Sequence, residues 1–367
     1  MKVEYLKDKL KWAIATAEKI TGKNLSLPAL AYVLLSAKNR QLTVQATNLD
    51  LGIKITLPVK VEEEGQVMVS GVILANFLSS LFGDNKITLS TSTNTLSVAT
   101  TGTASVLKTY PTDDFPTIPT VTEGEMIKLP ATQFLAGLRA VSYAASLSDI
   151  KPEIASVYIY HKTDELIFVA TDSFRLAEKR LPLKQKITVD LALIIPIKNI
   201  TEILRVFDGI DEELTLTYSH HQVAFATEQI YLTSRLVEGL YPDYQQIMPT
   251  NQMTEAVISK TELLNTLRLA TIFSGKLNQI NFKILTKEKL LEITSRDSDI
   301  GESSSRLAAT LDGENVEISF NIRYLLDCLQ SVTTDNVNLA FNGKQRPILV
   351  RGVGVKTFTY LIMPLNR

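Results

Sequence analysis

The sequence predicts an α+β protein built from three copies of one domain. Three segments share a pattern in which a strand ends in Thr or Ser, a polar turn containing Asp follows, and a second strand returns. These segments begin at Thr47, Thr171 and Ser295, each 124 residues after the one before. Helical and strand patterns recur with the same spacing, so each copy takes a third of the 367 residues, with two helices and roughly eight strands.

The helices follow from apolar residues that recur every three or four positions. Residues 6–20 show this spacing, which predicts an amphipathic helix. The corresponding helix of the second copy follows Pro130, and that of the third follows Ser259, which forms a capping-box pattern with Glu262. A second helix is predicted in each copy, at 72–82, 198–207 and 322–329.

The strands follow from short segments in which polar and apolar residues alternate. They are predicted at 41–45, 53–57, 166–170, 215–218, 222–226, 231–234, 316–319, 337–341 and 356–361. The uncharged segment between Lys86 and Lys108 alternates as well, which predicts a pair of half-buried strands and not a membrane span.

Two proline-containing segments, 110–119 and 241–249, separate the copies. Proline cannot continue a central strand, because it lacks the main-chain N–H. We expect both segments to be extended linkers, and we expect domains over 1–121, 122–250 and 251–367.

Composition limits the kinds of protein that remain. Lys and Arg total 38 and Asp and Glu total 39, so a net charge of −1 gives no global sign of a nucleic-acid partner. Apolar residues make up 45% and charged residues 21%, which excludes a disordered chain. The single cysteine, Cys328, excludes an internal disulfide framework and suits a reducing cytosol. We expect no secretory signal and no transmembrane segment.

The Asp-containing turns leave an enzymatic alternative open. Asp113-Asp114 and Asp297-Ser298-Asp299 could offer carboxylates to Mg²⁺, as in a multi-domain metal-dependent hydrolase or transferase. No P-loop accompanies them, and the three histidines lack metal-ligand spacing. Solvated turns are therefore the favoured interpretation, and we expect no catalytic residue, metal or cofactor.

Four longer segments resemble the bacterial β sliding clamps, the beta subunits of DNA polymerase III. They are ATDSFRLA at 170–177, TSRLVEGLYPDY at 233–244, FNIRYLLD at 320–327 and YLIMPL at 360–365. The resemblance covers the whole chain in order. It implies a head-to-tail homodimer whose six domains close a ring, with helices inside and sheets outside. It also implies a cytoplasmic, nucleoid-associated bacterial protein that encircles double-stranded DNA, acts as a processivity factor and is not itself an enzyme.

The resemblance places basic residues of the helices and two loops against DNA. Sequence-independent phosphate attraction suits a ring that must slide, because phosphate contacts carry no base information. A neutral total charge could then hide a basic inner wall balanced by an acidic exterior. Solvated helix faces are the alternative interpretation. The candidates are Lys7, Lys11, Lys23, Asn24, Arg139, Lys151, Lys198, Arg205, Lys260 and Arg268.

The resemblance also implies a hydrophobic pocket between the second and third domains. It would capture short peptides of the DNA polymerase III alpha subunit, the clamp loader and other proteins with clamp-binding motifs. Phe174, Ser173 and Gln245-Gln246 depart from the family pattern, so the rim is less basic and we expect a different peptide preference. The alternative is that Leu176, Ile247 and Met363 form ordinary inter-domain core. The pocket positions are Ile154, Thr171, Ser173, Phe174, Arg175, Leu176, Pro242, Ile247, Asn321, Tyr324, Met363, Pro364 and Leu365.

Positions at the subunit interface also follow from the resemblance. Ser105, Val106 and Leu107 would lie on an edge strand of the first domain, and Ile272 and Phe273 on the fifth helix. Pairing an edge strand with another chain satisfies its free main-chain groups. Ser105 stands where a large aromatic can occur in the family, so we expect a weaker dimer.

Overall fold

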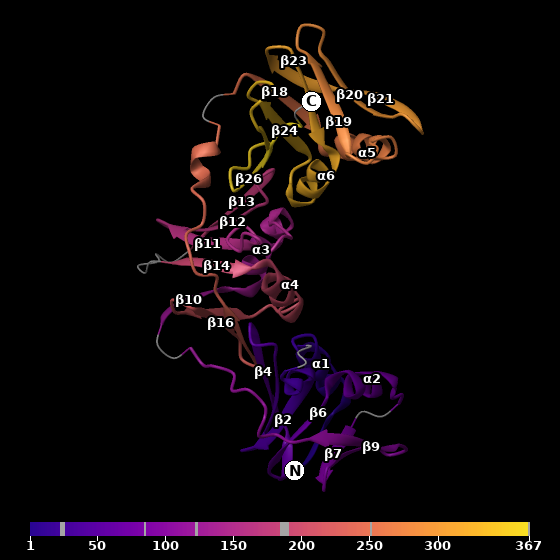
Figure 1. Ribbon diagram of the computed structural model, residues 1–367, viewed down its shortest axis with the longest axis vertical. Coiled ribbons are helices and arrows are strands. Elements are labelled where there is room, and N and C mark those ends of the chain that lie inside the picture. The colour runs from indigo at the N-terminus through magenta and orange to yellow at the C-terminus, as the bar shows by residue number, and fades with distance from the viewer. Residues whose placement is uncertain (23–25, 84–85, 122–123, 184–190, 250–251, 366–367) are drawn as a thin grey trace. The chain divides into compact units, whose positions relative to one another are not determined.

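The computed structural model describes residues 1–367 except 23–25, 84–85, 122–123, 184–190, 250–251 and 366–367. The chain forms two compact units (Figure 1). One contains Met1–Thr132 and Lys198–Leu236, and the other contains Gln133–Ile197 and Val237–Arg367. The six α-helices of the described residues are α1 (Lys7–Glu18), α2 (Gly71–Ser80), α3 (Ala131–Val141), α4 (Ile197–Val206), α5 (Lys260–Thr271) and α6 (Ile322–Ser331).

The first unit is organised on one 13-stranded antiparallel sheet, in the order β10-β15-β16-β17-β4-β3-β2-β6-β9-β8-β7-β1-β5. Helix α1 packs beside α2 and against β2, β3 and β4. The strands are β1 (Lys2–Leu6), β2 (Tyr32–Lys38), β3 (Gln41–Thr47), β4 (Leu51–Pro58), β5 (Lys60–Glu63), β6 (Gly65–Ser70), β7 (Lys86–Ser92), β8 (Thr95–Ala99), β9 (Ala104–Tyr110), β10 (Glu125–Pro130), β15 (Glu213–Tyr218), β16 (Gln222–Ala226) and β17 (Ile230–Arg235).

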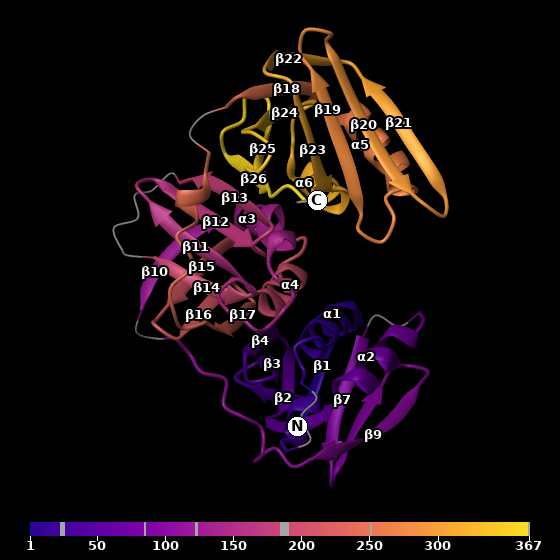
Figure 2. The ribbon, with the colours of Figure 1, turned by 45° about the horizontal axis from the view of Figure 1, so that its top comes forward.

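The second unit has a nine-stranded sheet, β14-β11-β12-β13-β26-β25-β24-β18-β22, and a four-stranded sheet, β21-β20-β19-β23. Helix α5 packs beside α6 and against β20 and β21 (Figure 2). The strands are β11 (Ser156–Lys162), β12 (Glu165–Thr171), β13 (Arg175–Pro182), β14 (Ala192–Pro196), β18 (Thr254–Ser259), β19 (Gln279–Leu285), β20 (Leu290–Asp297), β21 (Gly301–Leu307), β22 (Ala309–Gly313), β23 (Val316–Asn321), β24 (Asn336–Phe341), β25 (Ile348–Gly352) and β26 (Phe358–Ile362).

The order of elements repeats three times along the chain. Each copy has a strand, a helix, a group of three strands, one further strand, a second helix and a final group of three strands. Strands β5 and β22 are additions to the first and third copies. This repetition confirms the predicted α+β class and the predicted threefold internal repeat. The pair of strands predicted between Lys86 and Lys108 is also present, as β7 and β8.

Two of the three repeated turns, 47–51 and 171–175, are held by the same hydrogen bonds. In each turn the Thr hydroxyl donates to the carbonyl of the fifth residue, at 2.7 and 2.6 Å. The Asn or Asp in second place accepts from the amides of the fourth and fifth residues. The third residue, Leu49 or Ser173, has a left-handed backbone with φ of 78° or 75°. These bonds show that the two segments are one repeated turn.

Helix ends also repeat between copies. The Ser259 hydroxyl accepts from the amide of Glu262, which confirms the predicted cap of α5. Lys7, the first residue of α1, donates to the carbonyl of Leu81 at the end of α2. Lys260, the first residue of α5, donates in the same way to Val332 at the end of α6. Each lysine places positive charge on the last carbonyls of a helix, where the helix dipole favours it.

Several predicted details are wrong. The linker 241–249 is not extended throughout, because the amide of Met248 bonds to the carbonyl of Gln245 and closes a 3₁₀ turn over Tyr244–Ile247. The last strand begins at Phe358 and not at 356. The third repeated turn does not copy the other two: β20 continues to Asp297, whose carboxylate accepts from the amide of Asp299. Helix α5 ends at Thr271, so neither residue predicted on it for the subunit interface lies within it.

Candidate functional site

The turn 171–175 and the C-terminal segment 363–365 lie side by side in the second unit, where the sequence predicts one edge of the peptide-binding groove. Strand β13 pairs with β26, with Arg175 opposite Ile362 and Leu176 opposite Leu361. Beyond the ladder, the amide of Met363 donates to the carbonyl of Phe174 at 2.8 Å. The amide of Leu365 donates to the carbonyl of Ser319 on β23 at 2.9 Å. The C-terminal segment is therefore bonded on one side to the turn and on the other to β23.

Three apolar side chains of the predicted pocket remain open to solvent. Phe174 is 62% exposed, Ile247 is 53% exposed and Met363 is 37% exposed. Large apolar groups are usually covered in a monomer, and exposed groups that cluster mark binding surfaces. Leu176 differs, since it is 1% exposed and packs in a cluster with Val169. The core interpretation thus holds for Leu176 and not for Ile247 or Met363.

The Arg175 guanidinium is held between two carboxylates beside the turn 171–175. Arg175 Nε contacts Asp172 Oδ2 at 2.9 Å, and Arg175 Nη1 contacts Asp327 Oδ2 on α6 at 2.6 Å. The guanidinium carbon also lies 4.5 Å from the ring centre of Tyr324, a cation–π distance. Burial alone would lower the pKa of Arg175, but nearby Tyr360, the hydrogen bond to Asp327 and the charge of Asp172 together raise it. Arg175 is therefore a fixed cation that positions Tyr324 beside the turn.

The start of α6 is fixed independently. The Asn321 side chain accepts from the amide of Arg323 at 2.9 Å and caps the helix. This bond holds Asn321 at the end of β23, beside the C-terminal segment bonded to the same strand. Two further pocket residues, Pro364 and Leu365, are half-buried there.

The linker that carries Pro242 and Ile247 is anchored to the nine-stranded sheet, on the face opposite the Arg175 side chain. The Tyr244 hydroxyl donates to Glu178 Oε2 and lies 2.7 Å from the Tyr160 hydroxyl. Arg180 Nε donates to the other oxygen of Glu178 at 2.8 Å, so this buried carboxylate is paired. Burial, with the charge of Glu178, raises the pKa of Tyr244 and keeps its hydroxyl protonated.

The predicted pocket residues are thus only partly brought together. Hydrogen bonds join the turn to the C-terminal segment and, through Asp327, to the middle of α6. Thr171 and Ser173 serve the turn itself, through the Thr171 hydroxyl that accepts from the Ser173 amide. Pro242 is exposed on the linker. Ile154 is half-buried, and its main chain bonds to Ser146 and Lys151, so its place in the pocket stays a prediction.

Sequence reasoning missed the two carboxylates that hold Arg175. Asp172 and Asp327 lie inside segments that the resemblance singled out, yet neither was assigned a role. The contact between Arg175 and Asp327 joins residues 152 positions apart. Tyr324 and Asp327 are three residues apart on α6 and therefore share a helix face, which was the one available signal.

The predicted DNA-facing residues fall into three groups. Lys7 and Lys260 are occupied as caps of neighbouring helices, and Arg205 is paired with Glu202 at 2.7 Å. Lys23 and Asn24 lie outside the described residues. Lys11 is half-buried, whereas the remaining side chains are exposed on helices or a loop: Arg139, Lys151, Lys198 and Arg268.

The predicted interface residues lie on strand β9 and directly after helix α5. Strand β9 pairs fully with β8 but with β6 only at Thr109 and Tyr110. Among the described residues, the other edge of Ser105, Val106 and Leu107 therefore has no ladder partner. Ile272 is the C-cap of α5 and Phe273 follows it. Their amides bond three residues back and tighten the chain beyond the helix, which is why the predicted helix ran too far.

The acidic turns do not build a metal centre in the part of the chain that is described. No three His, Cys, Asp or Glu side chains gather there in an arrangement that could hold a metal ion. Among the same residues, no helix is long and apolar enough to cross a membrane.

The fold defines a class: an internally repeated α+β protein with long antiparallel sheets. Family models for the DNA polymerase III beta subunit match the chain in order, the N-terminal domain at 1–119, the central domain at 128–243 and the C-terminal domain at 245–366. The chain therefore belongs to the DNA polymerase III beta subunit family, the bacterial beta sliding clamps.

Individual relatives are similar to this chain along all or nearly all of its length. The beta sliding clamp of Synechococcus elongatus is 27% identical over 372 aligned positions, covering 100% of this chain and 99% of the relative. That of Staphylococcus epidermidis is 27% identical, covering 95% and 94%. The crystal structure of the Bacillus subtilis sliding clamp has a TM-score of 0.95 at 23% identity, covering 100% and 99%. A Pseudomonas aeruginosa clamp bound to griselimycin has a TM-score of 0.95 at 24% identity, covering 100% of both chains. These structures share the fold of this chain.

Proposed function

We propose that this protein is a non-catalytic DNA sliding clamp of the bacterial cytoplasm. Two chains, each with domains over 1–121, 122–250 and 251–367, associate head to tail and close a ring around double-stranded DNA. The observation that carries this proposal is the match of all three beta-subunit domains in order over one chain. A heterologous contact that closes on itself produces such a ring.

The ring holds DNA by topology, so its inner surface needs only weak attraction to phosphates. Exposed Arg139, Lys151, Lys198 and Arg268 supply positive charge without reading bases. Lys7 and Lys260 contribute less, because each is committed to a helix end. This division supports a smooth inner surface along which the clamp slides.

The groove beside the C-terminal strand binds short peptides of the DNA polymerase III alpha subunit, the clamp loader and other clamp-binding proteins. Exposed Phe174, Ile247 and Met363 are its apolar anchors. Methionine adapts to differently shaped partners, because its side chain is unbranched and polarisable. The Arg175 brace keeps Tyr324 in place beside them.

Retention on DNA of different topology tests the clamp. Protein loaded by a bacterial clamp loader onto a nicked circular plasmid should survive a wash in high salt, because a closed ring cannot leave. Linearising the plasmid should release it within seconds to minutes. Equal loss from the circular and the linear DNA would contradict the proposal.

Sedimentation tests the ring separately. Analytical ultracentrifugation should show a dimer at micromolar concentration, with a dissociation constant that Ser105→Phe lowers because the free edge of β9 gains an apolar contact. A monomer at every concentration tested would contradict the ring.

A further inference from the structure

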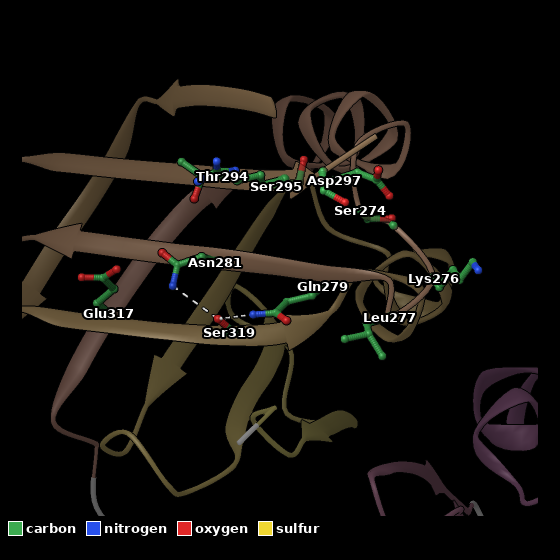
Figure 3. Close-up of a pocket in the computed structure, with 13 residues that line it drawn as sticks. Ser274, Lys276, Leu277, Gln279, Asn281, Thr294, Ser295, Asp297, Glu317 and Ser319 are labelled. Carbon is green, nitrogen blue, oxygen red and sulfur yellow. Dashed lines mark hydrogen bonds between the residues drawn. The ribbon is translucent and has the colours of Figure 1, made fainter. Parts of the chain in front are cut away.

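A polar concavity of about 460 Å³ lies on the outward face of the four-stranded sheet in the second unit (Figure 3). Three strands form its floor, β23, β19 and β20, and the loop 274–277 forms one wall. The outward residues of β19, Gln279 and Asn281, lie across from Asn321 and Ser319 on β23. None of the predicted DNA-facing residues that the structure describes lines this surface.

The concavity adjoins residues of the proposed peptide groove at Ser319 and Asn321. Ser319 belongs to both, because its carbonyl accepts from the Leu365 amide while its side chain lines the concavity. Asn321, a groove residue, stands directly opposite Gln279 in the β19–β23 pair. The C-terminal segment and the concavity therefore share strand β23.

The floor presents ordered carboxamides with hydrogen-bonding capacity to spare. Gln279 Nε2 and Asn281 Nδ2 both donate to the Ser319 hydroxyl oxygen, at 3.2 and 3.3 Å (Figure 3). The shared acceptor fixes both side chains. Among the described residues, no further hydrogen bond uses the carbonyl oxygen or the second N–H of either carboxamide. A row of paired donors and acceptors matches the main chain of an extended peptide, which alternates N–H and C=O.

Charge around the concavity selects against a strongly charged ligand. Lys276 and Arg296 line it together with Asp297 and Glu317, so the formal charges cancel. Leu277 projects from the loop beside it and offers one exposed apolar contact (Figure 3). Such a lining suits an uncharged polar segment with small side chains.

We infer that this concavity is an extension subsite of the groove, which binds an uncharged, extended segment flanking the apolar anchor of the same partner peptide. The inference rests on the proposed peptide-binding function of the groove. Strands lie about 4.8 Å apart, so crossing from β23 to β20 covers about 10 Å, which is three residues of extended chain at about 3.3 Å each. The subsite therefore reads three or four residues next to the anchor.

Fluorescence-polarisation titration of the full-length protein tests the subsite. The probes are an apolar anchor peptide alone and the same anchor with Ser-Gln-Asn-Ser added at its N-terminus or at its C-terminus. One of the extended peptides should bind about fivefold to tenfold more tightly than the anchor, as expected for one or two added neutral hydrogen bonds. No gain from either extension would overturn the inference.

Substitutions in the floor of the concavity test whether the gain in peptide affinity arises there. Gln279→Ala with Asn281→Ala should abolish the gain and leave affinity for the bare anchor unchanged, whereas Lys283→Ala, outward on the same strand but outside the concavity, should preserve it. Thr294→Tyr, which fills the concavity from β20, should act like the double variant and guards against a folding defect in either. A gain that survives both floor variants would overturn the inference.

Two other results separate the inference from the proposals on which it stands. Failure of the bare anchor to bind wild-type protein would refute the peptide groove, and the extension subsite with it. Binding of the anchor without any gain refutes the subsite alone. A change in sedimentation on Thr294→Tyr would assign the concavity to a contact between subunits and would also overturn the inference.

Discussion

Replacing Arg175 by methionine should destabilise the second unit far more than replacing an exposed arginine. Methionine keeps most of the aliphatic length and removes the charge. In the native protein the guanidinium contacts Asp172 and Asp327, and the Arg175 side chain is only 13% exposed. The variant leaves two carboxylates without their cation, and Tyr324 without its cation–π partner.

The size of the effect follows from how far each carboxylate is buried. Removing one partner of a buried ion pair costs about 3–5 kcal/mol. Asp172 is 15% exposed and approaches that range, but Asp327 is 38% exposed and regains some hydration. Asp172 also keeps its bonds to the amides of Phe174 and Arg175, which the substitution does not remove. We therefore expect a loss of about 2–4 kcal/mol in the free energy of unfolding.

Urea denaturation followed by circular dichroism measures this loss. The matched control is Arg205→Met, because Arg205 also contacts a carboxylate at close range but is 56% exposed. An exposed pair at this spacing contributes about 0.3–0.5 kcal/mol. Peptide affinity should fall in the Arg175 variant only, since Tyr324 loses its support. Equal losses in the two variants would refute the assignment of Arg175 as a buried brace.

Three further predictions test the anchors, the linker and the core. Met363→Ala with Leu365→Ala should weaken peptide binding at least a hundredfold, at about 2 kcal/mol or more for each truncated anchor, without changing sedimentation; an unchanged polarisation titration would contradict it. Tyr244→Phe should cost about 1–3 kcal/mol, because Oε2 of buried Glu178 loses its hydrogen bond to the hydroxyl while Arg180 still pairs with Oε1. The fold raises the pKa of Tyr244. The protonated hydroxyl therefore stabilises the folded protein fully below the unfolded pKa of about 10 and progressively less above it. In thermal melts, the wild type should lose more stability than Tyr244→Phe between about pH 10 and 11. Burial likewise raises the pKa of the Cys328 thiol, so a thiol reagent at pH 8 should modify Cys328 only at the rate of unfolding; fast labelling of folded protein would disprove its burial.

Local interactions made much of the fold predictable. The turn 171–175 closes within five residues, and the cap of α5 joins Ser259 to an amide three residues later. Patterns of this length are visible in a sequence because the interacting residues are neighbours. The 124-residue repeat then placed the same turn at 47–51.

The parts of the site that were missed depend on contacts between distant residues. Arg175 and Asp327 are 152 positions apart, and Tyr244 and Glu178 are 66 apart. Neither pair leaves a periodic signal, because each is brought together only when strands and helices pack. The bonds of the lysines at the starts of α1 and α5 were hidden for the same reason, since their acceptors lie more than 70 residues away.

The repeated turn has the same backbone in both units but different side chains. In the first unit the turn 47–51 keeps the same bonds, and the amide of Arg235 donates to Asp50 just as Met363 donates to Phe174. A cavity of only about 20 Å³ remains beside it, room for about one water molecule. Leu51 stands there in place of Arg175, so the fifth residue of this turn carries no charge. The repeat therefore dictates the backbone of both turns, whereas side chains outside the repeat pattern distinguish the turn that we propose binds peptides from the one that does not carry the brace.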